Sequence, residues 1–122
     1  MSAILFVDDD LVTLELMGQA ARLLGYPYHL ARSGEKAFEL LRKEKPGLIF
    51  LDMMMPDMDG LSVLKELKKD TDFGAIPVII LSAGASYDDS IVCLNEGASD
   101  YLLKPVPLQA LMEIIKKYET QS

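Results

Sequence analysis

Several acidic residues in this sequence directly follow apolar segments, and their carboxylates could take part in chemistry. Three consecutive acids, Asp8, Asp9 and Asp10, follow one short apolar run, and Asp52 follows another. Carboxylates crowded into one place repel one another, which raises their pKa values unless a cation neutralises them. The pattern therefore indicates a metal site, and a small number of oxygen ligands favours Mg²⁺.

A hydroxyl and an ammonium group occupy similar positions later in the chain. Ser82 follows the apolar run at 77–81, and Lys104 follows the short run at 100–103. A cation, a lysine and a hydroxyl around a carboxylate form an arrangement that suits the anionic oxygens of a phosphoryl group. Asp52 is then the candidate nucleophile that accepts the phosphoryl group, as in enzymes that form an aspartyl phosphate.

The fold must bring these residues together, and the chain alternates five times between a short apolar segment and a segment with helical periodicity. Fully apolar strands that alternate with helices are typical of a parallel sheet covered on both faces, so the predicted fold class is α/β. The predicted strands are 4–7, 28–31, 48–51, 77–81 and 100–103, and the predicted helices are 11–24, 35–44, one that begins near Leu61, 87–96 and one that begins after Pro107.

A parallel sheet explains how residues so far apart in sequence could meet. All the carboxyl ends of its strands lie along one edge, and ligands of open α/β sheets bind outside that edge. We therefore expect one crevice to hold the site, lined by Asp8, Asp9, Asp52, Ser82 and Lys104.

Length and composition exclude several classes of protein. The 122 residues suit one domain, 1–122, because domains commonly hold about 100–200 residues. The net charge of −7 opposes direct binding to nucleic acid. No apolar run approaches the ~18 residues of a membrane-spanning helix. The N-terminus lacks the basic region of a signal peptide, and one cysteine cannot form an internal disulfide, so the expected location is the cytoplasm, without membrane attachment.

Four segments in this order resemble the receiver domain of response regulators, the phosphoacceptor module of two-component signalling that includes the chemotaxis regulators. The segments are ILFVDDD at 4–10, DMMMPDMDG at 52–60, LSA at 81–83 and YLLKP at 101–105. The resemblance covers essentially the whole chain. It implies a flavodoxin-like fold, with a five-stranded parallel sheet of order 2-1-3-4-5 and five helices distributed over both faces.

The resemblance also implies a role for each residue of the predicted crevice. Asp52 would accept a phosphoryl group from a histidine kinase or phosphotransfer protein, with Mg²⁺ as cofactor and with slow self-phosphorylation and autodephosphorylation. Asp9 and Asp52 would bind Mg²⁺ directly, the backbone carbonyl of Met54 would be a third protein ligand, and Asp8 would act through water. Lys104 would pair with the phosphoryl group after a cis peptide bond to Pro105.

Two residues are implied as the switch that carries the signal away from the site. Ser82 would move to hydrogen-bond the phosphoryl oxygens, and Tyr101 would turn inward. The readout would be a repacked surface of the fourth helix, fifth strand and fifth helix. An output protein or output domain would bind that surface. Formation of a homodimer through the same surface is a further possibility. Met54 and Gly84 are expected to tune the access of water, giving an intermediate phosphoryl lifetime.

Two other functions remain open at this point. The sequence FVDDDLV at 6–12 resembles the nucleophile strand of haloacid-dehalogenase-type phosphatases, with Asp8 as nucleophile and Asp10 as acid, but that interpretation leaves Asp52 unexplained. A receiver-like interaction module that is never phosphorylated is the second alternative. The complete set of acids, hydroxyl and lysine argues against it. His29 and Cys93 are not expected to take part in chemistry.

Overall fold

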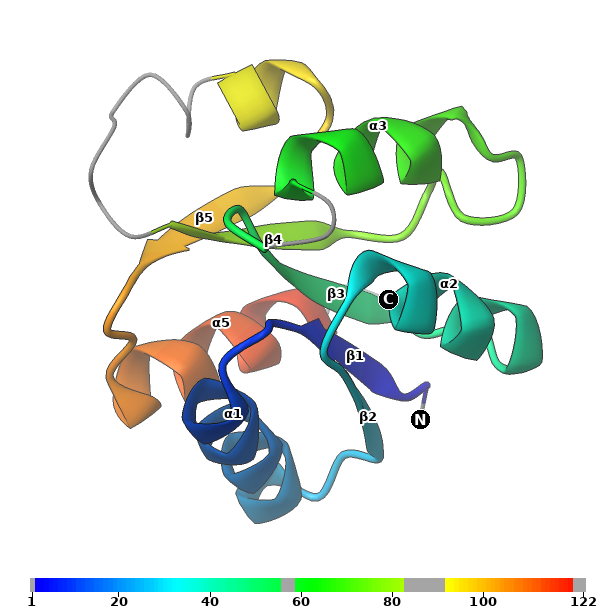
Figure 1. The fold of residues 1–122 in the computed structure, drawn as a ribbon. Helices are drawn as coiled ribbons and strands as arrows, with labels where there is room; N and C mark the ends of the chain where they lie inside the picture. The colour runs from blue at the N-terminus through cyan, green and yellow to red at the C-terminus, as the bar shows by residue number, and fades with distance from the viewer. Residues whose placement is uncertain (1, 56–58, 83–91, 120–122) are drawn as a thin grey trace.

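The computed structural model describes residues 2–55, 59–82 and 92–119 and shows an open parallel sheet between two layers of helices (Figure 1). All four strand pairings are parallel, and the strand order is β2-β1-β3-β4-β5, which confirms the predicted α/β class and the order implied by the resemblance. The strands are β1 (Ile4–Val7), β2 (Tyr28–Ala31), β3 (Leu48–Asp52), β4 (Val78–Ser82) and β5 (Asp100–Leu103).

Helices cover both faces of this sheet. Figure 1 shows α1 and α5 below it and α2 and α3 above it. Part of the predicted fourth helix, at 87–91, lies outside the described residues, and residues 92–95 form a helical turn on the side of α3. The helices are α1 (Leu11–Leu24), α2 (Gly34–Lys43), α3 (Gly60–Lys69) and α5 (Leu108–Glu119).

Alternate residues of the central strands build two separate cores. In β1, Leu5 and Val7 pack on the side of α2 and α3, whereas Ile4 and Phe6 pack on the side of α1 and α5. The same alternation continues in β3, where Phe50 stacks on Phe6 with ring centroids 5.1 Å apart. Because both faces are covered, β1, β3 and β4 are buried along their whole length, which explains their continuous apolar sequences.

Local signals set the ends of the helices. Gly25 ends α1 in the left-handed conformation (φ 83°), which favours glycine because it has no Cβ. Ser33 caps α2 by accepting a hydrogen bond from the Lys36 amide. The predicted start of the third helix near Leu61 is close to the observed start at Gly60, which Asp59 caps by accepting from the Ser62 amide at 2.8 Å.

Two strands are one residue longer at their carboxyl ends than predicted, because the polar residue itself joins the sheet. Asp52 pairs with Leu81 as the last residue of β3, and Ser82 pairs with Leu103 as the last residue of β4. Within the described parts of the chain, no helix has the length and apolar character needed to cross a bilayer.

Candidate functional site

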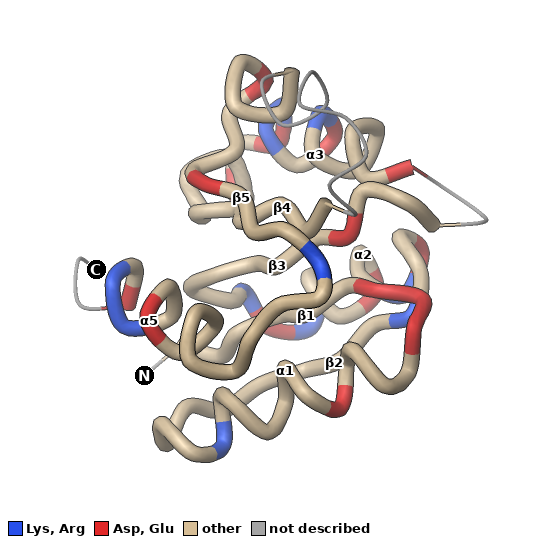
Figure 2. The backbone as a smooth tube through the Cα atoms, turned by 90° about the vertical axis from the view of Figure 1, so that its left-hand side faces the viewer, with Lys and Arg blue, Asp and Glu red and all other residues tan. Residues whose placement is uncertain are grey.

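The carboxyl ends of the strands carry the polar residues of the site. Asp8 directly follows β1 and its amide donates to the Ala31 carbonyl of β2, while Asp52 ends β3. Ser82 ends β4, and its carbonyl accepts a 2.7 Å hydrogen bond from the amide of Lys104 after β5. Figure 2 shows an unbroken acidic stretch in the chain between β1 and α1, beside a basic position between β5 and α5. The backbone therefore brings the predicted residues to one edge of the sheet.

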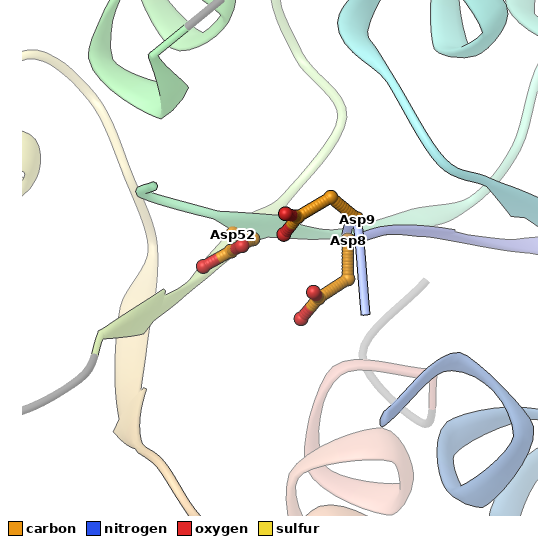
Figure 3. Close-up of side chains that lie close together, drawn as sticks. All are labelled: Asp8, Asp9 and Asp52. Atoms are coloured by element: carbon orange, nitrogen blue, oxygen red, sulfur yellow. The ribbon is translucent and has the colours of Figure 1, made fainter. Parts of the chain in front are cut away.

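Three carboxylates meet at this edge. Asp8, Asp9 and Asp52 each offer one oxygen, and these oxygens all lie within 4.8 Å of one another. Figure 3 shows the two side chains from the end of β1 and the one from β3 with their carboxyl groups close together. Asp8 and Asp52 are buried, and Asp9 is partly exposed. The predicted meeting of these three residues is confirmed.

Lys104 supplies the positive charge of the cluster. The Lys104 Nζ lies 2.7 Å from Asp8 Oδ2 and 3.1 Å from Asp52 Oδ1. The contact with Asp8 Oδ2 is an ion pair that lacks the geometry of a hydrogen bond. Burial by itself lowers the pKa of the Lys104 ammonium, but its contacts with the two carboxylates outweigh that effect and hold the pKa above its usual value. Lys104 is therefore charged throughout the physiological pH range.

The environment of Asp52 works against its ionisation. Burial raises the pKa of Asp52 to about 6, and the neighbouring Asp8 carboxylate acts in the same direction. The Lys104 ammonium and the Met54 amide, whose nitrogen lies 3.3 Å from Asp52 Oδ1, limit the rise. Near neutral pH the carboxylate is mostly ionised but held at an electrostatic cost, which a further positive charge would relieve.

The donor set of the cluster fits a divalent cation of the magnesium type. Its side-chain ligands are carboxylate oxygens alone, as hard cations prefer. Among the described residues, the ion pairs of these three carboxylates involve one ammonium, so the negative charges exceed the paired positive charge by two when all three are ionised. A divalent ion has the charge that balances this excess.

The start of α3 approaches the backbone at the end of β3 closely. The Gly60 amide donates to the Met53 carbonyl at 3.0 Å. A Cβ added at Gly60 would lie 2.4 Å from the Asp52 carbonyl oxygen, so a larger residue would push the start of α3 away from Asp52. Gly60 thereby helps to place the end of β3.

The other predicted residues take varied positions. Ser82 is buried, whereas Tyr101 is exposed on β5 and is not turned inward in this structure. The Lys104–Pro105 peptide is cis, as the resemblance implied. Asp10 lies outside the carboxylate cluster, and its side chain accepts a 2.6 Å hydrogen bond from Thr13. Gly84 lies outside the described residues.

Sequence reasoning missed two contacts around the site. Arg32, the residue after β2, donates to the carbonyl of Asp9 at 3.4 Å, and the rule that strand ends converge would have identified it. The Cys93 thiol, in the turn at 92–95, donates to the Met53 thioether at 3.1 Å. No sequence pattern links those two sulfur atoms. His29 pairs with Glu44 at 3.1 Å and belongs to no part of the site.

Comparisons with known proteins agree on one family. The family model for the response regulator receiver domain matches residues 4–116. Response regulator MprA of Mycolicibacterium vanbaalenii is 37% identical over 109 residues, which cover 89% of this chain and 46% of that protein. The chain thus spans about half the length of such curated relatives.

Solved structures give the same result over the full chain. The receiver domain of the Francisella response regulator 1452 is 32% identical, covers 100% of both chains and superimposes with a TM-score of 0.88. The chemotaxis protein CheY4 of Vibrio cholerae is 23% identical, covers 97% of this chain and 98% of its own, and has a TM-score of 0.90. The second likeness shows the fold alone.

Proposed function

The chain belongs to the response regulator receiver domain family, and on this basis we propose that residues 1–122 form one receiver domain acting as a phosphorylation-controlled switch, with Asp52 as the phosphoacceptor. Response regulators act with histidine kinases and output domains, and we propose a histidine kinase or phosphotransfer protein as the donor. One observation carries the proposal: Asp52, itself buried, lies in a cluster of three carboxylates, and Lys104 Nζ is 3.1 Å from its Oδ1.

The proposed reaction transfers a phosphoryl group to a carboxylate oxygen of Asp52. The oxygen attacks phosphorus while the bond from phosphorus to the donor nitrogen breaks, and the donor ring, protonated on its other nitrogen, keeps the bonding electrons and leaves as neutral imidazole. Lys104 would stay charged and follow the phosphoryl oxygens, because its ammonium already contacts Asp52. The same residues would later hold the aspartyl phosphate while water hydrolyses it slowly.

A bound Mg²⁺ is part of the proposal. Receiver domains generally bind Mg²⁺ through acidic residues, and the cluster here has the matching chemistry. We propose Asp9, Asp52 and the backbone carbonyl of Met54 as ligands, with Asp8 acting through water. The ion would supply positive charge that balances the carboxylates and the incoming phosphoryl oxygens.

The signal would leave the site through Ser82 and Tyr101. Phosphorylation adds charge and strong acceptor oxygens at the end of β3. The buried Ser82 hydroxyl, at the end of the adjacent strand β4, would shift toward them. Exposed Tyr101 on β5 would turn toward the space that this shift leaves. The changed surface of β5, α5 and the turn at 92–95 would then be read by an output protein or domain.

Phosphoryl uptake is the direct test of this function. With acetyl phosphate and Mg²⁺, intact mass spectrometry is expected to show the addition of one phosphoryl group to the protein. The Asp52→Asn variant should show no addition, because an amide oxygen is a poor nucleophile, and a chelator should abolish addition to the native sequence.

The matched control is Asp10→Asn, which removes an acid close to the site whose side chain bonds to Thr13 instead. It should take up the phosphoryl group at a rate close to that of the native protein. Equal uptake by the native protein and Asp52→Asn would refute the assignment of Asp52.

A further inference from the structure

Met54 is the most exposed of the methionines that the structure describes. The residue is 71% exposed, whereas Met17 and Met55 are buried and Met53 and Met112 are partly buried. Oxidation of methionine by peroxide depends on access to the sulfur. An oxidant reaching this part of the chain would therefore meet Met54 before the methionines of the core.

We propose that Met54 is a reversible oxidation site that changes the lifetime of the phosphoryl group on Asp52, an inference that rests on the proposed function. Peroxide would transfer one oxygen atom to the sulfur, forming a sulfoxide and leaving water, and methionine sulfoxide reductases would reverse the change. The oxidant is thus hydrogen peroxide, which is reduced to water, and the thioether is oxidised.

Oxidation at this position would leave the fold intact. A sulfoxide is polar, and burying a polar group without a hydrogen bond costs about 1–3 kcal/mol in proteins. Oxidation of Met55 or Met17 would carry that cost, since each is buried in one of the two cores. Met53 is held by its contact with Cys93 at 3.1 Å. The Met54 side chain already lies in water, so its oxidation changes local chemistry rather than packing.

The position of Met54 connects that chemistry to the phosphoacceptor. The Met54 amide nitrogen lies 3.3 Å from Asp52 Oδ1, so the Met54 backbone contacts the reacting carboxylate. The Met54 sulfur is only three bonds from the Cα of that same residue. A thioether is a weak hydrogen-bond acceptor, whereas the sulfoxide oxygen is a strong one. The sulfoxide would hold water beside the phosphoryl group, and hydrolysis would become faster.

The first part of the test is peptide mapping after a short exposure to hydrogen peroxide. In the folded protein, Met54 should form sulfoxide about 10-fold faster than Met17 and Met55, because it alone among these three residues is exposed. In urea the three rates should converge. If Met54 is oxidised no faster than Met55 in the folded protein, the proposal is overturned.

The second part compares the half-life of the aspartyl phosphate before and after peroxide. In the native protein, oxidation is expected to shorten it about 3-fold to 10-fold, the scale of one added hydrogen bond, and a sulfoxide reductase should restore it. Met54→Leu keeps every other methionine and Cys93, so its half-life should be the same before and after peroxide.

The outcomes separate this inference from the function on which it rests. A native protein that takes up a phosphoryl group but keeps its half-life after Met54 is oxidised overturns this inference alone. An equal response in Met54→Leu also overturns it, because another residue would then be responsible. If the unoxidised protein takes up no phosphoryl group at all, the proposed function fails and the inference fails with it.

Discussion

Replacing Lys104 with methionine is expected to lower the free energy of unfolding of the metal-free protein by about 3 kcal/mol. Lys104 is the ammonium that contacts both Asp8 and Asp52, and both carboxylates are buried. The variant leaves them without a counter-charge, which is the costly way to break a buried ion pair. The lower end of the usual range applies because the Lys104 side chain is 23% exposed.

Urea unfolding in the presence of a chelator measures this effect, and Lys117→Met is its matched control. Lys117 pairs with Asp100 at 3.6 Å, but the two side chains are 56% and 31% exposed, so its removal should change stability by less than about 1 kcal/mol. Adding Mg²⁺ should recover part of the loss in Lys104→Met, because the ion restores positive charge at the cluster. A loss no larger than that of Lys117→Met would show that Lys104 does not balance the carboxylates.

Replacing Asp9 with asparagine is expected to weaken Mg²⁺ binding about 10-fold to 100-fold. The change removes one unit of negative charge from a cluster whose oxygens lie within 4.8 Å of one another. Attraction between such charges at that range amounts to a few kcal/mol near a protein surface, and each 1.4 kcal/mol corresponds to about 10-fold in affinity. Titration calorimetry with MgCl₂ measures the dissociation constant, and phosphoryl uptake should fall in parallel.

Asp10→Asn serves as the control for this second prediction. It has the same change of charge in the adjacent residue, but Asp10 lies outside the cluster and bonds to Thr13. Its Mg²⁺ affinity should stay within about 2-fold of the native value, because screening by water weakens the contribution of an exposed charge. Equal losses in the two variants would mean that Mg²⁺ responds to the general negative charge of the segment rather than to a site built around Asp9.

The fold was predictable because its central strands are buried on both faces. Continuous apolar residues in β1, β3 and β4 identify covered strands, and the alternation with helices identifies a parallel sheet. From this it follows that Asp8, Asp52 and Lys104 share one edge, a prediction that the ion pairs of Lys104 confirm. The strand order could not be predicted from periodicity, because periodicity does not show which strands are neighbours in the sheet. It was predicted from the family resemblance.

Details that depend on side-chain contacts could not be predicted. The approach of Gly60 to the Asp52 carbonyl follows from how α3 meets the end of β3, and the pairing of Cys93 with Met53 joins residues 40 positions apart. The exposure of Tyr101 depends on which rotamer it adopts, since an edge strand allows both buried and exposed orientations. Arg32 is different, because its position after β2 was visible in the sequence.

Locating the phosphorylated residue tests the central claim most directly. After phosphorylation with acetyl phosphate and Mg²⁺, borohydride reduces an aspartyl phosphate to homoserine and releases phosphate, and tandem mass spectrometry then identifies the position. The account predicts homoserine at residue 52 and at no other position, with none formed when Mg²⁺ is removed. Homoserine at residue 8, the nucleophile of the alternative phosphatase, or no homoserine at all in the presence of Mg²⁺, would contradict it.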